Sequence, residues 1–212
     1  MKLMRGDMGG AATVVSSLLA IAQLQLPINV VTFTPLCENS PGPKATKIYA
    51  MNGKSVEVDN MDTEGRLVLP DALYYASTEF KPHTVIDVAI LTGVMDIALG
   101  EIYSGVFTTS DALWNRLNVA GESEYDRFWR MPLDEDYGAQ IYSSNADLCN
   151  TGGKLAGACT AALFLKAFVD GIEATDGLEP SVRWAYLDIA GTMEFTRPTP
   201  YQETGMTGRP VR

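Results

Sequence analysis

TVIDVAIL, residues 84–91, is the stretch that decides the fold class of this chain. It is almost wholly apolar and rich in β-branched side chains, which is typical of a strand buried on both faces of a sheet. Three more runs predict buried strands in the same way: 28–33 (INVVTF, between two prolines), 104–108 (SGVFT) and 184–189 (WAYLDI). Residues 54–58 alternate polar and apolar side chains after an Asn-Gly turn signal, which predicts a half-buried strand.

Four other segments have the composition or spacing of helices. Residues 11–26 are apolar on nearly every face, which predicts a helix buried on most sides and closed by Pro27. Residues 68–80, 113–125 and 156–169 also fit helices, with Pro70 tolerable only in a first turn. A loop is expected at 35–43 and a surface insertion at 171–180. Helices that alternate with buried strands predict an α/β fold, with ligands at the carboxyl ends of parallel strands.

The composition excludes several classes of function. The 212 residues include 16 Lys and Arg against 26 Asp and Glu, a net charge of −10, and no basic cluster, which argues against a nucleic-acid surface. The one histidine, His83, lies in a polar loop sequence, so a histidine-rich metal site is excluded and a metal would need mainly carboxylate ligands. We expect a soluble, intracellular protein without disulfides or a membrane span, because the three cysteines lack paired spacing and no long apolar stretch occurs.

Two short segments carry candidate chemistry. Asp62, Glu64 and Arg66 are spaced by two, so in extended backbone their side chains would project to one side. Two carboxylates and a guanidinium are costly to bring together unless a cation or an anionic ligand balances the charges. The alternative is a solvated acidic turn with an incidental arginine. Asp7 precedes Gly9-Gly10 at a predicted helix start, where helix capping is the simpler explanation.

Taken together, these segments resemble the leucine aminopeptidase (cytosol aminopeptidase) family of dinuclear metallopeptidases. Residues 1–12 (MKLMRGDMGGAA) resemble the family's M-x-x-M-K/R-x-D-M-G-G-A-A segment, and 61–67 (MDTEGRL) resemble its N-T-D-A-E-G-R-L signature. The resemblance continues in the family's order over essentially the whole chain, through 87–93 (DVAILTG), 129–133 (WRMPL), 156–157 (AG) with 161–166 (AALFLK), 187–192 (LDIAGT) and 205–210 (GMTGRP). A match of that extent is far more specific than any one of the short motifs.

The resemblance implies a three-layer helix-sheet-helix α/β fold with a mixed, mostly parallel central sheet. It also implies two divalent metal ions (Zn, Mn or Mg) that activate a shared water. Asp7 matches a ligand of one metal, Asp62 a ligand of the other, and Glu64 the carboxylate that bridges both. Arg66 matches the catalytic arginine, which in the family holds a bicarbonate ion that acts as the general base.

Other positions match the substrate site of the family. Leu91 would offer its backbone carbonyl to the free amine of a peptide, with Gly93 beside it. Met4, Ile90, Ala190 and Met193 match the pocket for an apolar, Leu-like N-terminal side chain, with ordinary core packing as the alternative for these four. The family further implies peptide substrates, a homohexamer and a cytoplasmic location, with no nucleic-acid or membrane partner.

The chain also departs from the family pattern. It begins after the segment that supplies a metal-binding lysine, a second bridging aspartate and the catalytic lysine, so residues 1–212 are expected to be a partial catalytic domain. The family's N-terminal domain and final helix are absent as well, and a short insertion is missing at Lys47-Ile48. Met61 and Thr63 replace a threonine and an alanine beside the ligands, and Ile90 replaces a pocket threonine.

Two other functions compete with an active aminopeptidase. One is a catalytically inactive relative that serves as a structural or binding protein, and the other is the DNA-binding role of some bacterial relatives. The acidic charge disfavours DNA binding.

Overall fold

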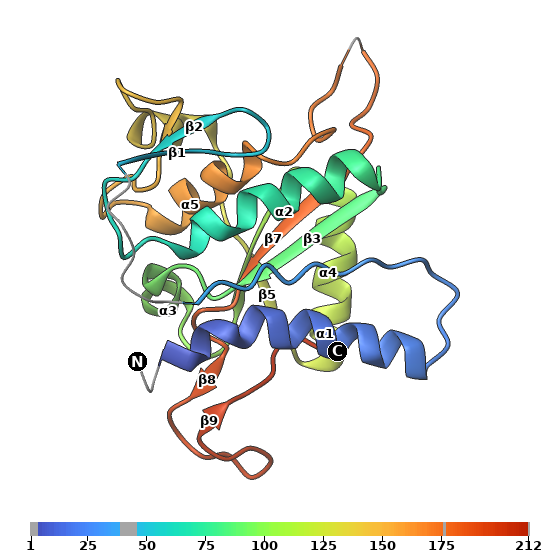
Figure 1. The fold of residues 1–212 in the computed structure, drawn as a ribbon. Helices are drawn as coiled ribbons and strands as arrows, with labels where there is room; N and C mark the ends of the chain where they lie inside the picture. Colours follow the sequence, from blue (N-terminus) through green and yellow to red (C-terminus); the bar gives the residue numbers. More distant parts are fainter. Residues whose placement is uncertain (1–3, 39–45, 176, 212) are drawn as a thin grey trace. The chain divides into compact units, whose positions relative to one another are not determined.

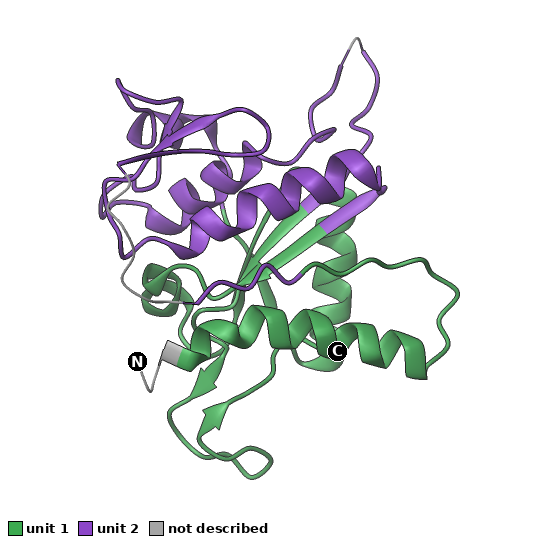
Figure 2. Cartoon of the chain, viewed as in Figure 1, with its two compact units in different colours: residues 1–33, 86–131, 185–212 green, residues 34–85, 132–184 purple. Residues whose placement is uncertain are grey.

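The computed structural model describes residues 4–38, 46–175 and 177–211. Contacts divide the chain into two compact units, each assembled from segments distant in the sequence (Figure 2). Unit 1 comprises residues 1–33, 86–131 and 185–212, and unit 2 comprises 34–85 and 132–184.

A four-stranded sheet of order β3-β7-β4-β5 forms the centre of unit 1 (Figure 1). Its strands are β3 (Thr84–Ala89), β7 (Arg183–Asp188), β4 (Ser104–Thr108) and β5 (Phe128–Arg130), and the first two residues of β3 and of β7 are assigned to unit 2. Strand β4 pairs with β5 in parallel and with β7 antiparallel. Backbone hydrogen bonds from Arg183 N to His83 O and from Ile189 N to Ala89 O show that β7 runs parallel to β3. The predicted mixed α/β sheet is confirmed.

Helix α4 (Asp111–Glu124) packs on this sheet. Ser110 caps its first turn, with Oγ accepting a hydrogen bond from Leu113 N over 3.2 Å. Beneath the helix lies one apolar cluster, formed by Val106, Leu113, Phe128, Ala185, Leu187 and Ile189. The rings of Phe107 and Tyr186 stack between neighbouring strands with centroids 5.6 Å apart, and both residues are fully buried. These contacts fix β4 and β7 against each other.

Helix α1 (Gly9–Gln23) follows the short 3-10 helix η1 (Met4–Met8). Its expected burial on most sides is wrong, because only Gly9, Gly10 and Thr13 are buried, all near its start. Val15 and Leu19 are 54% and 58% exposed. The small residues at the start of the helix allow close approach to β3, whereas every residue of the helix after Thr13 is half-buried or exposed.

The strand predicted at 28–33 is also absent from the part of the chain that the structure describes. Ile28 and Val31 are 54% and 55% exposed, and the segment makes no strand pairing there. A β-branched run favours extended backbone, but a strand also needs a hydrogen-bonded neighbour, and none of the described segments supplies one.

The remaining short elements of unit 1 are α3 (Gly93–Leu99) and an antiparallel pair, β8 (Glu194–Phe195) with β9 (Gly205–Met206). Both α3 and β8 begin a few residues after a sheet strand ends. The loops that lead into them are therefore held at the carboxyl ends of β3 and β7.

Unit 2 contains a three-stranded sheet of order β1-β2-β6 and two main helices (Figure 1). Strands β1 (Lys47–Tyr49) and β2 (Ser55–Glu57) are antiparallel, and β6 (Leu148–Cys149) lies parallel to β2. Helices α2 (Gly65–Glu79) and α5 (Gly157–Lys166) pack together, and the 3-10 helix η2 (Glu135–Gln140) packs on α5. The core of this unit is α5, which is buried from Ala158 to Leu165.

Most of the elements predicted from the sequence are confirmed, with shifts at their ends. Helix α2 begins at Gly65 rather than at residue 68, so Pro70 lies inside the helix beyond its first turn. The insertion at 171–180 is mostly exposed, whereas part of the loop predicted at 35–43 lies outside the described residues. In the part of the chain that the structure covers, no helix has both the length and the apolar character needed to cross a bilayer.

Candidate functional site

Two loops at the carboxyl ends of β3 and β7 carry most of the predicted substrate residues. The buried carboxyl of Asp188, the last residue of β7, joins them. Its Oδ2 accepts a hydrogen bond from Thr92 Oγ1 over 2.5 Å, and its Oδ1 accepts one from Ala190 N over 3.2 Å and one from Leu91 N over 3.4 Å. One side chain therefore holds the loop of Leu91 and Gly93 and the loop of Ala190.

The loop after β7 is fixed at three further points. A Cβ on Gly191 would lie 2.2 Å from the carbonyl oxygen of Gly100, so only glycine fits there. The hydroxyls of Thr192 and Ser104 are 2.6 Å apart. Thr207 donates from its N–H to Met193 O over 2.8 Å, so the backbone of Met193 is held as well.

The segment that carries Asp7 contacts the same loops within unit 1. A Cβ on Gly9 would lie 2.5 Å from Ile90 Cδ1, and a Cβ on Gly6 would lie 3.4 Å from Met193 Cε. Asp7 is exposed between these two glycines in η1. Unit 1 thus brings the Asp7 segment, Ile90 and Met193 together, whereas the side chain of Met4 lies outside the described residues.

The exposure of the predicted substrate residues is intermediate. Ile90, Leu91, Ala190 and Met193 are half-buried, and Gly93 is exposed at the first position of α3. Side chains of this exposure can contact both the protein and a bound molecule. Their assignment to a substrate site stays a prediction.

The predicted metal motif lies in unit 2, in a turn that leads into α2. The expectation of extended backbone through Asp62, Glu64 and Arg66 is wrong. Glu64 has helical backbone angles (φ −75°, ψ −32°) as the N-cap residue of α2, and Arg66 is the second residue of the helix. Asn60 explains the turn, because its Oδ1 accepts a hydrogen bond from Asp62 N over 2.9 Å and competes with extended structure.

Asn150, from the segment after β6, holds this turn from the inside. It is fully buried, and its Oδ1 accepts hydrogen bonds from Asp59 N at 3.0 Å and Asn60 N at 3.3 Å. Its Nδ2 donates to Asn60 O and to Thr63 Oγ1, both over 2.7 Å. The sequence reading missed Asn150, because an asparagine 90 residues from its partner gives no local signal.

The three side chains of the motif differ in exposure. Asp62 is exposed, Glu64 is half-buried and Arg66 is only 6% exposed. In residues 4–38, 46–175 and 177–211, no hydrogen bond or ion pair engages the carboxylate oxygens of Asp62 or Glu64. Uncommitted carboxylates of this kind fit the oxygen-donor chemistry of divalent cations.

Asp7 belongs to unit 1, whereas Asp62 and Glu64 belong to unit 2. Among the described residues, no group of three or more His, Cys, Asp or Glu side chains could hold a metal ion. The shared ligand role of the three carboxylates therefore stays a prediction. His83, as expected, is an exposed loop residue, whose Nδ1 lies 2.8 Å from Thr84 Oγ1.

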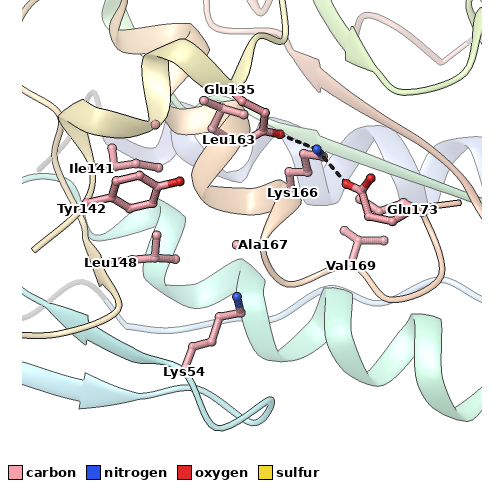
Figure 3. A pocket seen from close by; sticks show the side chains of 12 residues that line it. Lys54, Glu135, Ile141, Tyr142, Leu148, Leu163, Lys166, Ala167, Val169 and Glu173 are labelled. Carbon is pink, nitrogen blue, oxygen red and sulfur yellow. Dashed lines mark hydrogen bonds and ion pairs between the residues drawn. The ribbon is translucent and has the colours of Figure 1, made fainter. Parts of the chain in front are cut away.

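Unit 2 also contains a cavity of about 350 Å³ that the sequence did not indicate (Figure 3). Apolar side chains such as Leu148, Leu163 and Val169 line it together with the ammonium of Lys54. Lys166 closes one side through ion pairs to Glu135 at 2.5 Å and Glu173 at 2.8 Å. None of the predicted site residues lines this cavity.

Solved structures with the same fold identify the class of protein. The bottromycin maturation enzyme BotP matches with a TM-score of 0.87 and 35% identity, over 97% of this chain and 44% of that protein. BotP in complex with Mn gives a TM-score of 0.86 at 34% identity, over 97% of this chain and 45% of that one. A mutant of tomato leucine aminopeptidase gives 0.81 and 36%, over 99% of this chain and 40% of that chain. The fold is that of leucine aminopeptidase-like α/β enzymes.

The sequence comparisons identify the family. The model of the cytosol aminopeptidase family, catalytic domain, matches residues 1–212, and the chain belongs to this family. Cytosol aminopeptidase of Dictyostelium discoideum is 51% identical and that of Homo sapiens 50%, over the whole of this chain and 40% of each relative. A probable cytosol aminopeptidase of Rickettsia africae is 44% identical, over the whole of this chain and 42% of that relative. The chain thus spans about 40% of the length of the curated relatives it matches.

Proposed function

We propose that the protein to which this chain belongs is a metal-dependent aminopeptidase that removes Leu-like, apolar residues from the N-termini of peptides. Family membership supports the reaction class. The observation that carries the metal dependence is the turn before α2, where the carboxylates of Asp62 and Glu64 accept no hydrogen bond and form no ion pair in the described part of the chain.

In this proposal Asp62, Glu64 and Asp7 are ligands of two divalent cations, with further ligands from outside residues 1–212. Bound Zn, Mn or Mg would lower the pKa of a water molecule and polarise the scissile carbonyl. Structures of BotP include one in complex with Mn, which supports Mn as the first ion to test. The N-cap position of Glu64 keeps that residue at the start of α2, and the hydrogen bond from Asp62 N to Asn60 Oδ1 fixes the backbone at Asp62.

Arg66 would hold the general base. Arg66 lies on the first turn of α2 and is only 6% exposed as a residue, so packing restricts the orientation of its side chain. A guanidinium binds a planar anion through paired hydrogen bonds, and bicarbonate has the matching geometry. Bicarbonate held there would accept the proton of the attacking water.

The loops of unit 1 would bind the substrate. The Leu91 carbonyl would accept a hydrogen bond from the free amino group of the peptide, with Gly93 leaving room beside it. Half-buried Ile90, Ala190 and Met193, together with Met4, would form the wall of a pocket for the N-terminal side chain. Ile90 adds apolar volume, which favours unbranched or γ-branched side chains such as Met and Leu over polar ones.

The decisive experiment compares Glu64→Gln with Glu79→Gln in the full-length protein. The two glutamates lie at opposite ends of α2, and Glu79 is exposed. With Mn supplied, we expect Glu64→Gln to lower release of leucine from leucyl p-nitroanilide by at least about a hundredfold and to weaken Mn binding in calorimetry. The Glu79→Gln variant should keep both properties. Equal activity and Mn affinity in the two variants would refute the proposal.

Assembly and location belong to the same proposal. The family resemblance supports a homohexamer, and the name of the relatives supports a cytosolic location. Light scattering of the full-length protein tests the first, and fractionation of cells tests the second. Full Mn binding by a wild-type protein that releases no leucine would instead favour the inactive relative.

A further inference from the structure

Asp188 is a carboxyl buried where two parallel strands end. It is 0% exposed, and its hydrogen bonds reach Thr92 and Leu91 after β3 and Ala190 after β7. The hydroxyl of Thr92 is buried with it, since that residue is only 6% exposed. The carboxyl thus cross-links two loops that are about 97 residues apart in the sequence.

Burial of a carboxylate at this position costs desolvation free energy. Desolvation raises the pKa of Asp188, and the hydrogen bonds from Thr92, Tyr186, Ala190 and Leu91 oppose that rise by favouring the charged form. An apolar side chain would avoid this desolvation, but it could accept no hydrogen bond from either loop. The function of the carboxyl is therefore to hold the two loops in fixed positions relative to each other.

The hydrogen bonds fall on both sides of one particular peptide bond. Leu91 donates from its N–H to Asp188, which fixes the peptide unit that precedes Leu91. Thr92 donates from its side chain to the same carboxyl, which fixes the residue that follows. The peptide plane between them carries the Leu91 carbonyl, and the hydrogen bonds on both sides restrict its rotation.

We infer that Asp188, acting with Thr92, is a positioning residue that holds the Leu91 carbonyl and the Ala190 loop for the amino-terminal residue of the substrate. This inference rests on the proposed aminopeptidase function. Neither side chain needs to touch the substrate. Loss of the cross-link would let the amine acceptor and the side-chain pocket move independently, which weakens binding of the substrate more than the chemical step.

Thr92 offers the sharpest test, because valine keeps the shape of its side chain without the hydroxyl, whereas serine keeps the hydroxyl on a smaller side chain. In the full-length Mn-loaded protein, Thr92→Val should raise KM for leucyl p-nitroanilide about tenfold, with a much smaller change in kcat. Thr92→Ser keeps the hydroxyl and should restore KM to within about twofold of the wild type. Calorimetry with L-leucine should show the same pattern of affinities, while the Kd for Mn stays the same in all three proteins. Asp188→Asn provides a second route, with an increase in KM expected in the same direction.

Ser77→Ala is the matched control for simple destabilisation. Ser77 is a buried hydroxyl in α2 that donates to Leu73 O over 2.8 Å and accepts from Asp170 N over 3.0 Å. Its loss should lower thermal stability and leave KM unchanged. If Thr92→Val lowers stability with wild-type KM and leucine affinity, the inference is wrong and Thr92 is only structural. If the wild type binds Mn yet neither binds nor releases leucine, the proposed function fails and this inference fails with it.

Discussion

Asn150 Nδ2 donates a hydrogen bond to Thr63 Oγ1 over 2.7 Å, which joins the segment after β6 to the turn before α2. Thr63 extends this chain of hydrogen bonds, because its hydroxyl donates to Asn60 O over 2.8 Å. Asp62 lies between Asn60 and Thr63 in the sequence, so the chain on each side of this candidate ligand is tied to one buried amide. Within the described residues, the turn keeps its shape without any hydrogen bond to the Asp62 carboxylate.

Removal of the buried amide should affect both folding and metal binding. Asn150→Ala would leave the N–H groups of Asp59 and Asn60 and the carbonyl of Asn60 without their buried partner. We expect a loss of about 2 kcal/mol in the free energy of unfolding, since several hydrogen bonds worth about 0.5–1.5 kcal/mol each are lost while water can reach part of the exposed residues Asp59 and Asn60. Mn affinity of the full-length protein should fall as well. Urea unfolding and calorimetry measure the two effects.

Asn145→Ala is the control for this prediction. Asn145 is exposed, and its Nδ2 donates to Glu57 Oε1 over 3.2 Å in the same unit. Its substitution should lower the free energy of unfolding by well under about 1 kcal/mol and leave Mn binding unchanged. Matching losses in Asn150→Ala and Asn145→Ala would contradict a special role for the buried amide.

Thr63 departs from the alanine of the family pattern, and its hydroxyl has two hydrogen-bond partners here. Thr63→Ala should therefore destabilise this protein by about 1 kcal/mol, since one buried donor on Asn150 loses a partner. Thr63→Ser keeps the hydroxyl and should recover most of that loss. Thermal unfolding of the three full-length proteins checks the order, and equal stabilities would show that the hydroxyl contributes nothing.

The metal motif shows which of its features could be predicted from the sequence and which could not. The chemistry of Asp62, Glu64 and Arg66 could be predicted from residue types, but the side-by-side placement in extended backbone could not. Asn60 closes a local turn, and Gly65 starts a helix despite its low helix propensity, because α2 packs on α5. Long-range partners such as Asn150 leave no periodic signal.

The strands show the same limit. TVIDVAIL was predicted correctly as a strand, which spans Thr84–Ala89 as β3 because β7 pairs with it, but its predicted burial on both faces is wrong, since Ile86 is 45% exposed. INVVTF has an equally strong β-branched pattern and forms no strand in the part of the chain described here. Hydrophobic pattern predicts what backbone a segment favours, whereas pairing depends on a neighbour elsewhere in the fold.

The close contact between α1 and β3 gives a third prediction. A Cβ on Gly10 would lie 2.3 Å from the carbonyl oxygen of Val88, whereas a Cβ on Gly93 would meet nothing within 4 Å. Gly10→Ala should therefore lower the free energy of unfolding by about 1–3 kcal/mol, because the added methyl group would clash with backbone that cannot move aside. Gly93→Ala, the control, should leave stability within about 0.5 kcal/mol of the wild type. Chemical denaturation of the full-length variants measures both, and equal stabilities would contradict the contact.

The last prediction concerns Asp147, which ties the end of the 143–147 loop to β2. Its Oδ2 accepts hydrogen bonds from Ser55 N at 2.7 Å and from Ser55 Oγ at 2.8 Å. The backbone bond, and then the side-chain bond, lower the pKa of Asp147 from its ordinary value of 3.8. A carboxyl whose pKa is depressed by folding stabilises the folded state above its unfolded pKa, and that stabilisation is lost as the pH falls through the folded value.

The stability difference between the wild type and Asp147→Asn should therefore stay constant from pH 7 down to about pH 4 and shrink below it. The asparagine cannot titrate, and all other carboxyls are common to both proteins, so the difference isolates Asp147. Urea unfolding at a series of pH values measures it. A difference that stays constant below pH 3.8, or grows there, would show that the Ser55 hydrogen bonds do not favour the ionised carboxyl.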